Sequence, residues 1–558
     1  MKDKLNSDFD LEIQKIFNNI LTDLRAYKWK DWLKIKTKEE YEEFALKLSG
    51  LNSIEDIYER IKKEKSNSVN LSVDLYSYVV SSLGSDILIM CHTSGTTNSN
   101  LSRLKWFHMS KSLIQRLWAP GMRAIFESSG LNSKNSAIIF VPSRINFDGI
   151  RLIEGKKYIS LYSSEFSQRV VISTIKPYSY LLYQYKHSCN LDIIAKILSM
   201  EKISVISAPA LTIIKWADPV KFKRGLKDSI KEISKGSNPK KETLLKIINK
   251  EGLNDGSKII QKLLSDKLSK ATIIFSISSL NQNQWSLIRH FMKWKQGQER
   301  FTNLYVASEI GPFASSISED DYKIAQLNKM YIFPLTLPVI ENSGKFELVS
   351  RSNFKLGKLY ISRFDNGKPL INIDIGDVIK IEKQEGLPLI SGKILRAGFR
   401  LKYPIKFSKK TEIPSKYIIL AGDYFTFKEF NIIEPRNLLN CLNTNCESEI
   451  DSILLIKSEK KENIPWKLVL YFNGNSNCTK KIKVYTIIQK CLKEKAMGKA
   501  INNNSLRIQL MDEQPIDFMK TREFILKKVH KGFMPKGILK KWPLYIVLPS
   551  SYLDEIFI

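Results

Sequence analysis

The sequence predicts an α/β fold with a largely parallel sheet, and three observations support this prediction. The chain has 558 residues, which is enough for about three or four domain-sized units with ample core. Hydrophobic residues make up 43% of it, a share typical of globular proteins. Short apolar runs at 137–142, 203–207 and 271–279 alternate with amphipathic segments, which is the pattern of buried strands joined by helices.

Residues 1–80 are predicted to be mostly helical. Apolar residues between Phe9 and Leu21 recur at helical spacing, and the segment 36–47 opens with Thr37 and acidic residues. Both features indicate amphipathic helices with a defined N-terminus.

The segment 86–107 has the composition of an anion-binding loop that leaves a buried strand. An apolar run ends at Cys91, small polar residues fill 93–99, and a basic, aromatic segment returns at 103–107. Backbone N–H groups of such a loop can converge on an anion, and a later lysine can meet its charge. The loop therefore predicts a phosphate site, and an ordinary Ser/Thr-rich surface turn is the alternative.

A lysine-rich helical stretch occupies 218–270, with Gly, Asn and Pro residues at 236–239 and 254–256. We interpret it as an inserted pair of basic helices on the surface, solvated rather than bound to a partner. Beyond residue 400, alternating strands are expected at 450–456 and 466–472, which predicts a separate C-terminal domain.

The net charge of +31 is unusual, and such an excess attracts polyanions. Acidic residues are interspersed through most segments, however, and no basic stripe alternates with aromatic residues. We therefore expect a solvated lysine surface and do not expect a nucleic-acid partner.

No apolar run approaches the roughly 18 residues of a membrane span, and the charged start of the chain lacks the apolar core of a signal peptide. The six cysteines are scattered without a C-x-x-C pair. The expectation is a cytoplasmic protein with reduced thiols and no membrane span.

The loop residues resemble the nucleotide loop T-S-G-T-T-G-x-P-K of the adenylate-forming superfamily, which includes acyl-CoA synthetases, peptide-synthetase adenylation domains and firefly luciferase. The matching residues are Thr93, Ser94, Gly95, Thr96 and Thr97. Asn98 stands where the family has glycine, and Lys105 matches the family lysine if the loop is four residues longer.

Two further motifs follow in the family's order. Tyr305 and Glu309 have the spacing of Y-G-x-[ST]-E, whose Tyr stacks on adenine and whose Glu holds magnesium. The segment 368–378 resembles P-L-I-R-Y-R-T-G-D-L of the phenylacetate–CoA ligase branch. The terminal Asp of that motif, which would be Asp377 at a strand-to-turn junction, accepts hydrogen bonds from the ribose hydroxyls.

The C-terminal part resembles the family's hinge and mobile lid. Asp423 would be the hinge residue, and the segment 392–396 is the alternative. The lid lysine that the family requires would be Lys536, on a Pro-Lys-Gly loop, or else Lys520.

This resemblance implies a large N-terminal region of stacked α/β subdomains and a small mobile α+β C-terminal domain. The expected boundaries are a helical segment 1–80, an AMP-binding domain 81–421 that includes the insertion 218–270, and a lid domain 422–558. The implied reaction joins a carboxylic acid to ATP with Mg²⁺, releasing pyrophosphate, and then passes the acyl group to CoA or another acceptor.

Departures from the family pattern bear mainly on the second step. Asn372 replaces an arginine, Glu429 replaces a hinge-side glycine, and the strand 273–279 lacks G-G-E. Two alternatives therefore remain: acyl transfer to an amine or protein acceptor, and a degenerate, non-catalytic nucleotide-binding relative.

Overall fold

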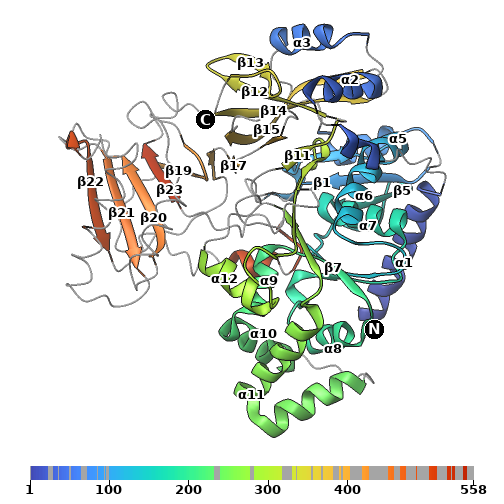
Figure 1. The fold of residues 1–558 in the computed structure, drawn as a ribbon, viewed down its shortest axis with the longest axis vertical. Coiled ribbons are helices and arrows are strands. Elements are labelled where there is room, and N and C mark those ends of the chain that lie inside the picture. The colour runs from blue at the N-terminus through green and yellow to red at the C-terminus, as the bar shows by residue number, and fades with distance from the viewer. Residues whose placement is uncertain are drawn as a thin grey trace. The chain divides into compact units, whose positions relative to one another are not determined.

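The structure of the protein is a computed structural model, shown as a ribbon in Figure 1. It describes residues 2–22, 29–35, 37–49, 52–64, 72–84, 86–93, 95, 100–231, 239–276, 282–316, 330–334, 336–353, 356–365, 368–380, 389–390, 394–396, 398–401, 417–425, 450–457, 466–472, 486, 502–511, 524–529, 531–534 and 544–549. The chain divides into two compact units. The large unit comprises 1–93, 105–375 and 379–393, and the small unit comprises 94–104, 376–378 and 394–558.

The N-terminal region is helical, as predicted. Its elements are α1 (Lys2–Ile20), η1 (Trp29–Lys34), α2 (Lys38–Ser49), α3 (Ile54–Lys63) and α4 (Leu75–Ser81). Thr37 and Glu40 form a reciprocal capping pair at the start of α2, because each backbone N–H donates to the other's side-chain oxygen at 3.1 Å. This pair satisfies two N–H groups that the helix itself cannot bond.

A four-stranded sheet carries the segment singled out in the sequence. Its strands are β1 (Leu88–His92), β2 (Trp106–His108), β4 (Gly149–Ile153) and β5 (Lys156–Tyr162), in the order β2-β1-β5-β4. Strand β1 runs parallel to β5 and antiparallel to β2. The last four residues of β1 are buried, as expected of the apolar run.

An eight-stranded sheet forms the centre of the large unit and confirms the predicted parallel arrangement. In spatial order its strands are β16 (Leu389–Ile390), β11 (Met330–Ile332), β10 (Gly311–Ser315), β9 (Phe301–Ala307), β8 (Thr272–Ser276), β7 (Ile203–Ser207), β3 (Ser136–Val141) and β6 (Ser179–Gln184). The five strands from β9 to β6 are parallel. They include the three apolar runs predicted as strands, which are β3, β7 and β8.

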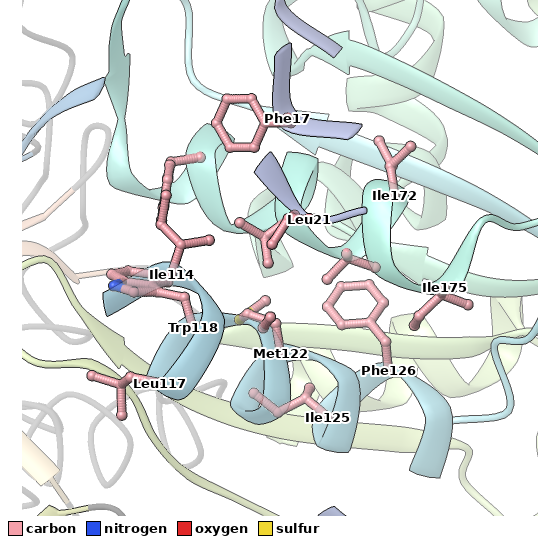
Figure 2. Close-up of a cluster of buried hydrophobic side chains, with 14 of the residues drawn as sticks. Phe17, Leu21, Ile114, Leu117, Trp118, Met122, Ile125, Phe126, Ile172 and Ile175 are labelled. Atoms are coloured by element: carbon pink, nitrogen blue, oxygen red, sulfur yellow. The ribbon is translucent and has the colours of Figure 1, made fainter. Parts of the chain in front are cut away.

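Helices that pack with this sheet carry its apolar core. They are α5 (Lys111–Leu113), the π-helical turn η3 (Ile114–Trp118), α6 (Ala119–Ser128), α7 (Ser163–Ile175), η4 (Tyr185–His187), α8 (Leu191–Ser199), α9 (Ala210–Ala217), α10 (Pro219–Lys231), α11 (Pro239–Leu268) and α12 (Gln282–Phe291). Figure 2 shows part of one cluster, in which Trp118, Met122 and Phe126 lie near Phe17 of α1 and Ile172 of α7.

Pro120 lies in a helix and does not interrupt it. The proline lies in the first turn of α6, directly after η3. A proline is tolerated in a first turn because its missing N–H would have no helical partner there.

The basic helices α10 and α11 are part of the core and not a surface addition. Leu226, Ile248 and Leu264 are buried in the same cluster as Ile206 of β7 and Ile273 of β8. The helix α11 bends where Gly252 takes a left-handed φ of 75°. The many lysines on the other faces of α10 and α11 made the apolar positions of these helices hard to recognise in the sequence.

The remaining strands form two further sheets. The first contains β13 (Lys345–Leu348), β12 (Thr336–Asn342), β14 (Leu356–Asp365) and β15 (Lys368–Lys380) in that order. The small unit contains β17 (Ile394–Arg396) and a sheet of β18 (Phe399–Arg400), β19 (Tyr417–Gly422), β23 (Leu544–Pro549), β20 (Ile450–Lys457), β21 (Trp466–Phe472) and β22 (Leu506–Met511).

The α/β fold class is thus confirmed, and so are the strands expected at 450–456 and 466–472. The sheet of the small unit already begins with β18 and β19, ahead of the expected boundary at residue 422. Among the described residues, no helix is long and apolar enough to cross a membrane.

Candidate active site

The loop that follows β1 starts and returns at one place. His92 pairs with Trp106 in the antiparallel β1–β2 ladder, and the Thr93 N–H donates to the Lys105 carbonyl at 3.3 Å. Gly95 is buried with φ of 64°, a left-handed conformation that glycine adopts without strain. The Lys105 side chain is exposed. Ser94, Thr96 and Thr97 lie outside the described residues.

A buried histidine holds the first residue of this loop. His92 Nδ1 lies 2.9 Å from the Thr93 carbonyl oxygen, and Nε2 lies 2.9 Å from Asp148 Oδ1. The same carboxylate accepts from Ser160 Oγ at 3.0 Å and from the Ile145 N–H at 2.8 Å. Both ring nitrogens thus lie within hydrogen-bond distance of oxygen atoms, and these two contacts fix the orientation of the imidazole.

The thiol of Cys91, the residue before His92, is not part of this hydrogen-bond network. Cys91 is completely buried, and burial, with the nearby charges of Asp148 and Glu165, raises its pKa well above the usual value. A thiol in this state is a packing group and not a nucleophile. Both cysteines of the described segments, Cys91 and Cys189, are free and buried, as expected for reduced thiols.

The second motif lies at the carboxyl end of β9. Tyr305 is buried on this strand, with its ring centroid 4.9 Å from that of Phe313 in an edge-on contact. Glu309 lies half-buried in the turn between β9 and β10. Its carbonyl accepts from Arg363 Nη1 at 3.2 Å, so the backbone of the turn is held and the carboxylate is not used for that contact.

Ser163 links the start of α7 to the β9 turn. It directly follows Tyr162, which pairs with His92 in the parallel β1–β5 ladder. Its Oγ lies 2.7 Å from Oγ of Ser308, the residue before Glu309. Adjacent parallel strands lie about 4.8 Å apart, so the large unit brings Thr93, the start of α7 and the Glu309 turn together at one edge.

The third motif differs from expectation in its local structure. Asp377 is half-buried within β15, which continues to Lys380, so the predicted strand-to-turn junction is wrong. Gly376 before it has φ of 73° and distorts the strand without ending it. The segment 376–378 belongs to the small unit, as does Gly95.

Asn372 has a structural role of its own. Its backbone is left-handed at φ of 53°, and its buried Nδ2 donates to the carbonyls of Ile61 at 2.9 Å and Glu64 at 2.8 Å. These carbonyls lie at the C-terminal end of α3, where a helix has no internal donors for them. The residue that replaces the family's arginine therefore caps a helix here.

The predicted hinge and lid residues are described only in part. Asp423 follows β19 and is buried, whereas Lys520 and Lys536 lie outside the described residues. The division between the two compact units along the chain falls at Lys393 and Ile394. It coincides with the alternative hinge segment, and the position of the hinge stays a prediction.

Glu309 is the expected Mg²⁺ ligand, and its chemistry fits that role. Mg²⁺ is usually held by one or two carboxylates together with substrate phosphates, and keeps several waters. Among the residues that the structure describes, no group of three or more His, Cys, Asp or Glu side chains forms a metal cage. The half-buried Glu309 carboxylate is of the chemical type that holds Mg²⁺ together with a phosphate ligand.

Sequence reasoning missed His92, Asp148 and Ser163. His92 carried a faint signal, as a polar residue at the end of a buried strand. Asp148 lies 56 residues along the chain from His92, in a loop that matches no motif. Ser163 looked like an ordinary helix-start serine.

The chain is similar to several solved structures at low sequence identity. It is similar to the GH3.15 acyl acid amido synthetase, at 13% identity over 90% of this chain and 91% of that one, with a TM-score of 0.48. It is also similar to the amide bond synthetase McbA from Marinactinospora thermotolerans, at 10% identity over 77% and 68% of the two chains, with a TM-score of 0.39.

A third similar structure is 2-hydroxyisobutyryl-CoA ligase in complex with 2-HIB-AMP and CoA, at 11% identity over 93% of each chain, with a TM-score of 0.37. These neighbours are adenylate-forming enzymes. No family model and no curated protein matches the chain. At these identities and TM-scores the likenesses say nothing of the reaction or substrate of this chain.

Proposed function

We propose that the protein activates a carboxylic acid with ATP, forming an acyl-adenylate and pyrophosphate, and then passes the acyl group to an acceptor such as CoA or an amine. The observation that carries the proposal is the 2.7 Å contact between Ser163 and Ser308. It links the start of α7, whose preceding residue Tyr162 pairs with His92 at the end of β1, to the turn that carries Glu309.

The reaction asks for positioning and charge neutralisation. A carboxylate oxygen attacks the α-phosphorus of ATP in line, and the bond to the pyrophosphate oxygen breaks as the acyl–phosphate bond forms. Backbone N–H groups of the loop 93–99 would hold the phosphates. Lys105 and the lid lysine would offset the charge that develops in the transition state.

Glu309 and Asp377 would hold the rest of the nucleotide complex. Glu309 would hold Mg²⁺, which when bound neutralises the phosphate oxygens. Asp377 would accept hydrogen bonds from the ribose hydroxyls, and the ring of Tyr305 would contact the adenine. The contact of the Arg363 guanidinium with the Glu309 carbonyl supports the proposal, because it holds the backbone of the turn that carries this carboxylate.

The test is pyrophosphate release measured over a panel of carboxylic acids, with and without CoA and with and without amine acceptors. Acid-dependent release that is lost in Glu309→Gln supports the proposal. Saturable ATP binding without release for any acid would instead support the non-catalytic alternative. Dependence of product formation on CoA or on an amine identifies the acceptor.

The lid lysine provides a second test. We expect Lys536→Ala to reduce adenylate formation by orders of magnitude, because its charge is needed only in that transition state. Transfer from preformed acyl-AMP should change much less. The matched variant Lys520→Ala should stay active, and an inactive Lys520→Ala beside an active Lys536→Ala would exchange the two roles.

A further inference from the structure

A polar cavity lies in the large unit, at the amino ends of β8 and β9 in the eight-stranded sheet. It encloses about 700 Å³ between the end of α6, the end of α11 and the segment that joins α12 to β9. Thr272, at the start of β8, and Arg300, just before β9, line it. The candidate active site lies beyond the other end of β9, about 20 Å away along a seven-residue strand.

The lining is cationic and contains no carboxylate. Its charged residues are Lys270, Lys293, Lys295 and Arg300. Lys293 is paired with Asp266, whereas the other three form no ion pair among the described residues. Arg300 Nη1 donates to the Lys270 carbonyl at 2.8 Å. Arg300 and Lys270, two of the unpaired residues, therefore lie on the same side of the cavity.

The nearest buried carboxylate does not offset this charge. Glu299 is completely buried, and it accepts from Arg289 Nε at 2.9 Å and from the Gly297 N–H at 2.8 Å. The charge of Glu299 is therefore compensated by Arg289 and not by the cations that line the cavity. Like charges that converge without compensation raise the local concentration of anions.

The neutral donors of the cavity are few and specific. The hydroxyls of Ser128, Ser129 and Ser269 donate to backbone carbonyls, so their hydrogens are not available to a ligand. Trp294 also lines the cavity and is 8% exposed, and its buried Nε1 has no acceptor within the described part of the chain. A buried donor without a partner is rare in folded proteins.

We infer that this cavity binds a small, multiply charged oxyanion of the diphosphate class. Three unpaired cations match the charge of such an anion, and the volume lies within the range of small-ligand sites. A phosphate oxygen beside Trp294 would accept from the indole after a small movement of its side chain. The site is separate from the proposed nucleotide site and does not depend on its activity.

The test is calorimetry of the full chain with inorganic pyrophosphate, without nucleotide. We expect saturable binding that weakens about 100-fold in Lys270→Ala/Lys295→Ala, since each charged hydrogen bond contributes about tenfold. The matched control Lys186→Ala/Lys345→Ala removes two other exposed lysines of the same unit and should bind as the wild type does. Equal binding by the two double variants would overturn the inference.

A further variant separates this cavity from the candidate active site, where pyrophosphate would leave as a product. Lys105→Ala should retain the binding. If Lys105→Ala loses it while Lys270→Ala/Lys295→Ala keeps it, the anion belongs to the active site and the cavity is not a site. Trp294→Phe, which keeps the ring and removes the N–H, should bind several-fold more weakly, and unchanged affinity would exclude the indole as a donor.

Discussion

Two buried polar clusters of the large unit differ in the elements that they connect. In the first, Glu165 of α7 contacts Arg144 at 2.5 Å and Arg169 at 2.8 Å, and both arginines reach Asp10 of α1. In the second, Asp148 contacts His92, whose other nitrogen contacts the Thr93 carbonyl. The first group ties one helix to another, whereas the second ties a strand end to the first residue of a loop.

This difference separates fold stability from site geometry. Removing one member of a buried ion pair leaves an uncompensated charge, which is costly wherever it occurs. The Glu165 group lies between helices, so its loss should appear as lost stability. The His92 group supports the candidate phosphate loop, so its loss should appear mainly as lost activity, because a small misplacement of a reacting group slows a reaction greatly.

The largest expected effect is that of Glu165→Gln. It leaves the buried Arg169 and the mostly buried Arg144 with only the partly exposed carboxylate of Asp10, and we expect the free energy of unfolding to fall by about 3–5 kcal/mol. Urea denaturation followed by tryptophan fluorescence measures it. The control Glu12→Gln breaks an exposed pair with Lys157 and should change stability by less than about 1 kcal/mol. Equal effects of the two variants would contradict the comparison.

The same carboxylate predicts a dependence of stability on pH. Burial by itself would raise the pKa of Glu165, but the guanidinium groups of Arg144 and Arg169 outweigh it and lower the pKa from 4.5 to about 2. Because the folded pKa is depressed, this stabilisation is complete above pH 4.5 and is lost as the pH falls toward 2. It amounts to about 3 kcal/mol. Denaturation midpoints across this range should fall more steeply for the wild type than for Glu165→Gln.

The next effect is that of Asp148→Asn, which keeps the shape of the side chain and removes its charge. We expect stability to fall by about 1–3 kcal/mol and acid-dependent pyrophosphate release to fall by about 100-fold. Glu165→Gln, assayed under conditions where it is folded, should retain most of its activity. An active Asp148→Asn would show that the contact between Asp148 and His92 serves only the fold.

The smallest effect concerns Asn372, which holds the end of α3 without any charge. Asn372→Gly keeps the left-handed backbone and removes both hydrogen bonds to the carbonyls of Ile61 and Glu64, so we expect a loss of about 1–2 kcal/mol. Asn504→Gly, at an exposed asparagine with φ of 52°, is the matched control and should be nearly neutral. Thermal denaturation compares them, and equal midpoints would exclude the capping role.

The strands of the central sheet could be predicted because buried parallel strands are continuous apolar runs, as in β3, β7 and β8. The core role of α10 and α11 could not, because their many lysines obscured the apolar positions Leu226 and Leu264. A charge surplus spread over a whole chain weakens every helical pattern in it.

The candidate site could be predicted only where its residues are close in sequence. Tyr305 and Glu309 form a local motif, but the contact of His92 with Asp148 depends on how β1 and the loop after β3 fold together. Asn372 was noticed in the sequence only because it stands where the resembling motif has an arginine. Its capping of α3 could not be predicted, because the carbonyls that it binds are more than 300 residues away in the chain.

The closed ends of the loop after β1 have a consequence for its length. Pairing of β1 with β2 and the bond from the Thr93 N–H to the Lys105 carbonyl hold the two ends together whatever lies between them. For a loop of about seven to eleven residues, four added residues cost only about 0.4 kcal/mol of closure entropy. Insertions and deletions between Thr93 and Lys105 are therefore almost neutral for folding. The length of this loop can change between related chains while the positions of its first and last residues stay the same.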